Sequence, residues 1–220
     1  MLLEDIQKSI DDMNDIQQLE QAAKDSKNQE RLDNSFAAAV NENHKVVAGV
    51  DRARSYLRFT PSRELKSQML RILTDSMDSI NKGTVQDSKI RFLNGQITAL
   101  KESVETEWAV FYAGIANRRI STLTTVQNIT PDPTKTGYAI TKMKNGSVIN
   151  YSDTSNLRLM SEGVRDADTI LGSMGLTEEI LQFLNKVSGG KATILDLTDP
   201  IVQWIKEERL TGKFVIGFGK

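Results

Sequence analysis

The chain has 220 residues, with 28 Lys and Arg against 29 Asp and Glu, which gives a formal net charge of -1. A balanced charge creates no overall field that attracts nucleic acid or an anionic membrane, so any such role requires a local patch. The sequence has no cysteine, which excludes disulfides, thiolate catalysis and cysteine-ligated metals, and a cytoplasmic location is expected. No apolar run approaches the roughly 20 residues that a membrane-spanning helix needs, so we expect no membrane partner.

The first segment carries a narrow apolar stripe at helical spacing. Acidic residues fill most positions between the apolar ones, and Lys8 is the only basic residue up to residue 20. A narrow stripe with polar flanks is typical of a coiled-coil seam or a docking helix. We therefore predict a protein-interaction surface made of six residues: Leu3, Ile6, Ile10, Met13, Ile16 and Leu19. The polar stretch 22–34 fits either a continuation of this helix or a loose connection.

Three further long helices are predicted before residue 130, over about 30–59, 61–81 and 87–120. Pro61 separates the first two, with Thr60 expected as the N-cap of the second and Gly83 as its C-terminal cap. The apolar face expected to enter the core in this second helix consists of Leu65, Met69, Leu73, Met77 and Ile80. Long helices joined by tight turns predict an antiparallel helical bundle or coiled-coil hairpin over residues 1–129.

The pattern changes after residue 129, where two prolines and a glycine within 130–137 predict a linker. Two β-prone runs then flank Asn145-Gly146, which predicts a β-hairpin over 138–151. Short helices are expected over 157–171 and 178–187, another begins at Thr198-Asp199-Pro200, and 213–218 reads as a strand. The protein is thus expected to be mainly α, with residues 138–220 forming a small α+β domain.

Three short stretches resemble parts of phosphate-binding, metal-binding or catalytic sites, but each is better explained by a local structural role. The stretch Ser188 to Thr193 resembles a phosphate loop but lacks the required glycine and hydroxyl, so a helix C-cap is favoured. Asp132 lacks the second acid of a magnesium site and is interpreted as an Asp-Pro turn. His44, the single histidine, has no serine elbow beside a partner acid and is expected at the surface. We therefore predict no catalytic residue, no metal site and no cofactor.

One local cluster of charge stands out on both sides of Pro61. Within twenty residues the chain carries Arg52, Arg54, Arg58, Arg63, Lys66 and Arg71. Such a patch can follow phosphates or meet an acidic protein surface, although a solvated basic face is favoured because charged helix faces are common.

The function predicted from these patterns is a non-catalytic interaction or adaptor subunit. It would assemble through long amphipathic helices into a homo-oligomer or a larger protein complex, because exposed apolar seams gain stability by being buried. The alternative is a nucleic-acid-associated accessory subunit of a bacterial multiprotein system that uses the basic cluster.

Overall fold

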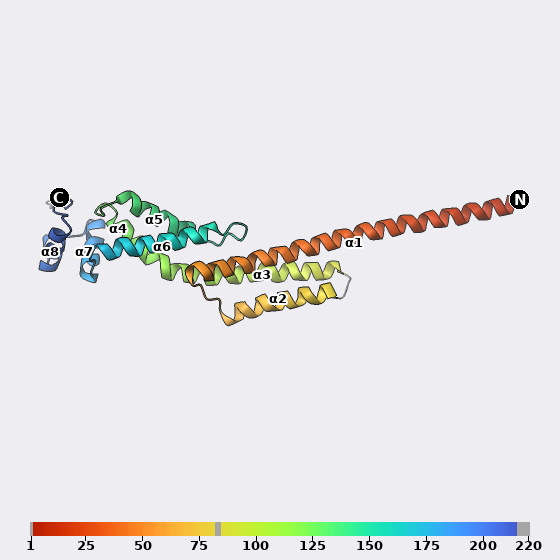
Figure 1. Ribbon diagram of the computed structural model, residues 1–220, viewed down its shortest axis with the longest axis horizontal. Coiled ribbons are helices and arrows are strands. Elements are labelled where there is room, and N and C mark those ends of the chain that lie inside the picture. The colour runs from red at the N-terminus through yellow and green to blue at the C-terminus, as the bar shows by residue number, and fades with distance from the viewer. Residues whose placement is uncertain (1, 82–84, 215–220) are drawn as a thin grey trace. The chain divides into compact units, whose positions relative to one another are not determined.

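A computed structural model shows a mainly helical chain (Figure 1). The structure describes residues 2–81 and 85–214, with side chains from residue 17 onward. The chain divides into two compact units, one formed by residues 1–48 and 61–104 and the other by residues 49–60 and 105–220. In the described part of the chain no helix is both long and apolar enough to cross a bilayer.

Helix α1 runs without a break over Leu2–Leu57, where the sequence predicted two helices. The polar stretch 22–34 is a continuation of the helix, because neither proline nor glycine occurs before Gly49. Side-chain hydrogen bonds one turn apart support the exposed stretch: Gln21 donates to Asp25 and Gln29 donates to Asp33, each at 2.9 Å. A helix of 56 residues is about 84 Å long.

Helix α2, Arg63–Asn81, begins at a serine cap. The Ser62 Oγ accepts a hydrogen bond from the Leu65 amide at 3.0 Å, whereas the hydroxyl of Thr60 donates to the carbonyl oxygen of Arg58. The predicted Thr60 cap is therefore wrong, and Ser62 takes its place because it lies directly before the first helical residue. The predicted cap at Gly83 lies outside the described residues.

The first unit is a three-helix bundle in which α1, α2 and α3, Asp87–Tyr112, lie side by side (Figure 1). Its buried residues from α1 and α3 recur at steps of three and four, as in a coiled coil: Leu32, Phe36, Ala39, Asn43 and Val46 in α1, and Ile90, Leu93, Ile97, Leu100 and Val104 in α3. An ion pair between Glu42 and Lys101 joins α1 to α3. The hydrogen bond from Lys101 lowers the pKa of the Glu42 carboxyl below its usual range.

In the second unit, the predicted fourth helix continues through a change of helix type. After α3 the chain forms a π-helical segment, Ala113–Asn117, and then α4, Arg118–Val126. The Arg119 guanidinium donates to the Ile115 carbonyl oxygen at 2.7 Å and also pairs with Asp168. The Arg119 side chain thus reaches back one turn to the backbone where the helix changes from π to α.

Residues 138–151 do not form the predicted β-hairpin. They belong largely to helix α5, Pro133–Asn145, and no described residue of the C-terminal region lies in a strand. The Asp132 side chain accepts from the Lys135 amide at 2.9 Å and caps α5, and Pro133 occupies its first turn. Gly146, expected in a hairpin turn, ends the helix instead. The predicted linker 130–137 therefore contains the start of α5, and the α+β expectation is corrected to all-helical over the described residues.

The three short helices predicted after residue 155 agree with the structure. Helices α6, Ser155–Ser173, and α7, Glu178–Ser188, match the predicted ranges, and α8, Asp199–Glu207, begins at the predicted start signal. Thr177 caps α7 by accepting from the Ile180 amide at 3.3 Å. A short 3-10 segment, Ile194–Asp196, links α7 to α8. Most of the predicted strand 213–218 lies outside the described residues.

Candidate protein-interaction surface on helix α2

Helix α2 presents two different faces. The inner face, which packs in the three-helix bundle, buries Leu65, Ile72, Ser76 and Ser79. The two serines are small, and each satisfies its hydroxyl within the helix: Ser76 donates to the Ile72 carbonyl at 2.7 Å and Ser79 donates to the Asp75 carbonyl at 2.8 Å. The inner face of the C-terminal half of α2 is therefore poor in apolar side chains.

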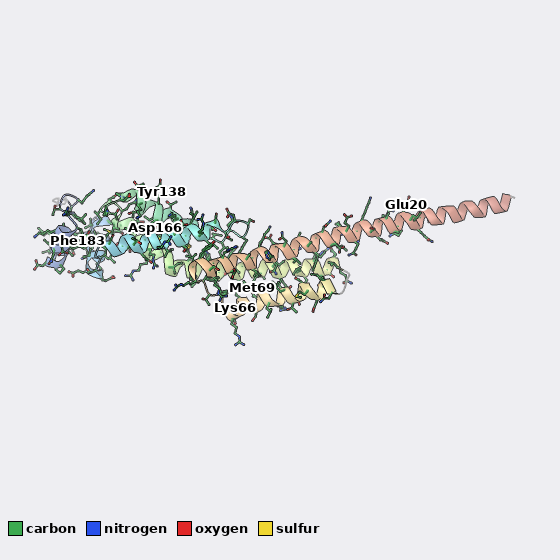
Figure 2. The ribbon with its side chains drawn as sticks, in the orientation of Figure 1. Glu20, Lys66, Met69, Tyr138, Asp166 and Phe183 are labelled. Carbon is green, nitrogen blue, oxygen red and sulfur yellow. The ribbon has the colours of Figure 1, made fainter. Side chains whose placement is uncertain are left out.

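One exposed side of α2, next to the buried face, is apolar. Leu70 is 66% exposed, Leu73 43%, Met77 62% and Ile80 59%. These four residues, which we call the outer stripe, are separated by three, four and three positions, the spacing of a two-heptad coiled-coil seam. Figure 2 marks Lys66 and Met69 on the same helix. In the C-terminal half of α2, the outer stripe therefore holds more large apolar side chains than the buried face does.

The sequence interpretation of α2 was wrong for most of its core face. Leu65 is buried and Met69 is partly buried as predicted, but Leu73, Met77 and Ile80 lie outside the core. The reason is that α2 carries two series of apolar residues offset by one position. The series Leu65, Met69 and Ile72 packs inward, whereas the series that begins at Leu70 stays exposed. Leu70 was missed altogether, although its spacing to Leu73 was visible in the sequence.

The predicted N-terminal stripe lies on α1, which is helical from Leu2. The side chains of five of its six residues lie outside the described residues: Leu3, Ile6, Ile10, Met13 and Ile16. The sixth, Leu19, is 71% exposed, and every residue of α1 from 17 to 28 is exposed. In this stretch α1 has no buried face. Glu20 in Figure 2 marks the stretch.

The six basic residues are all exposed, but they divide between the two units. Arg63, Lys66 and Arg71 belong to α2 in the first unit, and the Arg71 Nε lies 4.0 Å from an Asp75 carboxylate oxygen. The other three belong to the second unit: Arg52, Arg54 and Arg58. Apart from Arg71, none of the six forms an ion pair within the described ranges.

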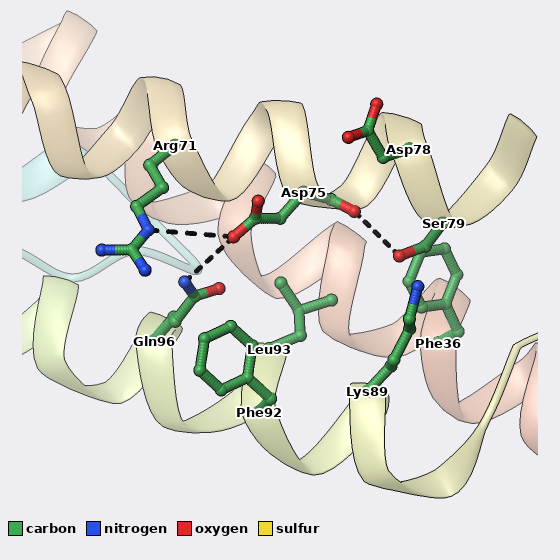
Figure 3. Close-up of a pocket in the computed structure, with 9 residues that line it drawn as sticks. All are labelled: Phe36, Arg71, Asp75, Asp78, Ser79, Lys89, Phe92, Leu93 and Gln96. Atoms are coloured by element: carbon green, nitrogen blue, oxygen red, sulfur yellow. Dashed lines mark hydrogen bonds and ion pairs between the residues drawn. The ribbon is translucent and has the colours of Figure 1, made fainter.

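A cavity of about 330 Å³ opens on the first unit between α2 and α3, with Phe36 of α1 also in its lining (Figure 3). Gln96 donates a hydrogen bond to the Asp75 carboxylate at 3.1 Å across it. The remaining charges in the lining are of both signs: Arg71, Asp78 and Lys89. No group of three acidic or histidine side chains that could hold a metal occurs in the part of the chain that the structure describes.

Asp132, which was interpreted as part of an Asp-Pro turn, is the N-cap of α5, and His44 is exposed on α1 as expected. Gly189 is the C-cap of α7 and Gly190, with φ of 65°, follows it, so the phosphate-loop-like stretch ends a helix.

No protein-family model, no curated protein and no solved structure matches the chain significantly.

Proposed function

We propose that this protein is a non-catalytic interaction subunit that assembles through its long helices, with copies of itself or within a larger protein complex. The observation that carries the proposal is the outer stripe of α2, whose four large apolar side chains are 43% to 66% exposed. Burying such a side chain fully yields about 1.5–3 kcal/mol, so covering the stripe supplies much of the free energy of a specific association.

The buried serines of α2 strengthen this proposal. If Leu73 and Met77 served only the fold, packing would place them inward, where Ser76 now lies. A surface that retains large apolar residues while serines occupy the core is typical of a helix that packs on two sides.

Sedimentation velocity over a range of protein concentrations tests the proposal. The wild-type chain is expected to associate as concentration rises, whereas the variant Leu73→Ser with Met77→Ser is expected to associate at least about 30-fold more weakly, because two apolar contacts are lost. Val110→Ser is the control, since Val110 is 73% exposed but lies outside the outer stripe. A wild-type chain that stays monomeric at every concentration contradicts assembly of the chain with copies of itself.

A second candidate function is association with nucleic acid. It is favoured by the exposed guanidinium groups of Arg54, in the last turn of α1, and Arg58, directly after it, which form no ion pair within the described residues. The double variant Arg54→Glu with Arg58→Glu is then expected to abolish retention on a DNA resin at low salt. Equal retention of the variant and the wild-type chain contradicts it.

A further inference from the structure

We propose that the C-terminal half of α2, residues 73–81, undocks from α1 and α3 as a local unit while the rest of the three-helix bundle stays folded. The opening exposes apolar side chains that α1 and α3 bury, and it does not depend on what covers the outer stripe. Three features of this half of α2 support the inference: its buried face, its polar contacts and the cavity beside it.

The buried face of α2 loses its large apolar side chains after Ile72. Leu65 is 1% exposed and Ile72 is 3% exposed, and both anchor the helix in the bundle. Beyond Ile72 the buried residues of α2 are Ser76 and Ser79. A buried serine removes much less apolar surface from water than a leucine or an isoleucine does, so residues 73–81 gain little free energy by packing inward. The large apolar side chains of this half belong to the outer stripe and are exposed even while the helix is docked.

The polar contacts of this half attach it only weakly to the bundle. The hydroxyls of Ser76 and Ser79 donate to carbonyl oxygens of α2 itself, so neither bond crosses to another helix. Gln96 of α3 donates to the Asp75 carboxylate at 3.1 Å, and this bond joins the two helices. The Gln96 Oε1, however, is buried and has no hydrogen-bond partner in the part of the chain that the structure describes. Because opening lets water pair with this oxygen, the Gln96 amide stabilises the docked state less than a fully paired amide would.

The cavity of about 330 Å³ lies beside the same half of α2 (Figure 3). Asp78 and Ser79 of α2 line it, together with Leu93 of α3 and Phe36 of α1. Side chains that border a gap lack packing partners on one side, so they lose part of the dispersion attraction that holds helices together. Phe36 is 7% exposed and Leu93 is 4% exposed, and movement of α2 away from the cavity uncovers both.

The undocked segment is too short to remain helical by itself. Residues 73–81 make about two and a half helical turns, and isolated helices shorter than about 12–15 residues are marginal in water. We therefore expect separation from α1 and α3 to be coupled to loss of helix in this segment. Such an opening exposes much less surface than unfolding of the whole unit, so it occurs more often.

Thiol labelling of full-length single-cysteine variants tests the inference, because the natural chain has no cysteine. Ser79→Cys places a thiol on the buried face of α2, and Ala39→Cys is the matched control on the buried face of α1, since Ser79 is 7% exposed and Ala39 is 4% exposed. In dilute protein an aromatic disulfide reagent is expected to label Ser79→Cys at least about tenfold faster than Ala39→Cys. Urea is expected to accelerate labelling of Ala39→Cys more steeply, because global unfolding exposes more surface than local opening does.

Equal labelling rates with equal urea dependence overturn the inference, because α2 then opens only when the whole unit unfolds. Equally fast labelling of both variants without urea also overturns it, since the opening is then not confined to α2. Hydrogen exchange of the wild-type chain supplies a second measurement that needs no substitution. Backbone amides of residues 74–78 are expected to exchange at least about tenfold faster than those of residues 97–101 in α3. Equal protection of the two segments contradicts the inference even if a cysteine variant fails to fold.

Discussion

The indole Nε1 of Trp108 donates a 3.0 Å hydrogen bond to the backbone carbonyl oxygen of Gly146, although 38 residues separate them in sequence. Both residues are buried, and Trp108 also contacts the rings of Phe59 and Phe111. The bond satisfies a carbonyl group at the C-terminal end of α5, where the helix itself offers no donor. This contact ties the end of α3 to the turn that follows α5 within the second unit.

Replacing Trp108 by phenylalanine is expected to lower the free energy of unfolding by about 2–4 kcal/mol. The change removes the only side-chain donor shown for the Gly146 carbonyl oxygen and leaves space in a packed aromatic cluster. Urea denaturation followed by circular dichroism measures the effect. Tyr138→Phe is the control, because Tyr138 is 67% exposed and its change is expected to stay within about 0.5 kcal/mol. Equal stability of Trp108→Phe and wild type contradicts the assigned contact.

Gly146 is expected to tolerate no side chain. A Cβ atom there would lie 2.3 Å from the Met160 Sδ and 2.6 Å from the Met160 Cβ, so Gly146→Ala is expected to cost about 1–3 kcal/mol of unfolding free energy. The matched control is Gly172→Ala, where nothing lies within 4 Å of the added Cβ atom and the alanine is expected to stabilise α6 by about 0.5–1 kcal/mol. Thermal unfolding is expected to show a lower midpoint temperature for Gly146→Ala and a higher one for Gly172→Ala. Midpoints that shift in the same direction in both variants contradict this prediction.

Arg58 ends α1 in a left-handed conformation, with φ of 61°. This conformation costs an L-residue about 1–2 kcal/mol and costs glycine almost nothing. Arg58→Gly is therefore expected to raise the free energy of unfolding by about 1 kcal/mol, whereas Arg54→Gly, inside the last turns of the same helix, is expected to lower it by about 1 kcal/mol. Equilibrium unfolding in urea measures both. Destabilisation by Arg58→Gly would refute the assigned backbone conformation.

Asp196 is expected to titrate well below an ordinary aspartate. The hydrogen bond from Lys186, supported by those from the Thr193 amide and hydroxyl, lowers the pKa of the Asp196 carboxyl to about 2. Because the folded pKa lies below the unfolded value of about 3.9, these bonds contribute stability above pH 4 and lose it as pH falls from about 4 to about 2. A carboxyl carbon NMR titration checks this, and Lys186→Met is expected to move the midpoint upward. A midpoint near 4 in the wild-type chain contradicts the assignment.

The sequence predicts the helices of this protein well wherever capping residues and apolar spacing agree. Thr177, whose side chain caps α7, and Pro200, in the first turn of α8, mark the starts of these helices correctly, because both act on the residues next to them. The hairpin prediction failed because the local Asn145-Gly146 signal competes with a helical pattern beside it. Thr136, Ala139 and Met143 recur at helical spacing and are buried, and this burial outweighs the β propensity of the segment.

The outer stripe could be found only in part from the sequence. Leu73, Met77 and Ile80 were visible as an apolar pattern, but the same pattern fits a core face, and periodicity alone does not say which of two offset stripes packs inward. The decision depends on Ser76 and Ser79, whose hydroxyls are satisfied by their own helix and so can be buried. Which side of α2 faces the bundle therefore depends on three-dimensional packing and cannot be derived from the spacing of apolar residues alone.

The rate at which peroxide oxidises Met77 tests the central claim most directly, namely that the outer stripe is covered when the protein assembles. Met77 is 62% exposed in the single chain, so its thioether is open to oxidant at low concentration. The account predicts at least about tenfold slower oxidation of Met77 in concentrated wild-type protein, and no slowing in the Leu73→Ser variant. An oxidation rate of Met77 that is the same in dilute and concentrated wild-type protein would contradict it.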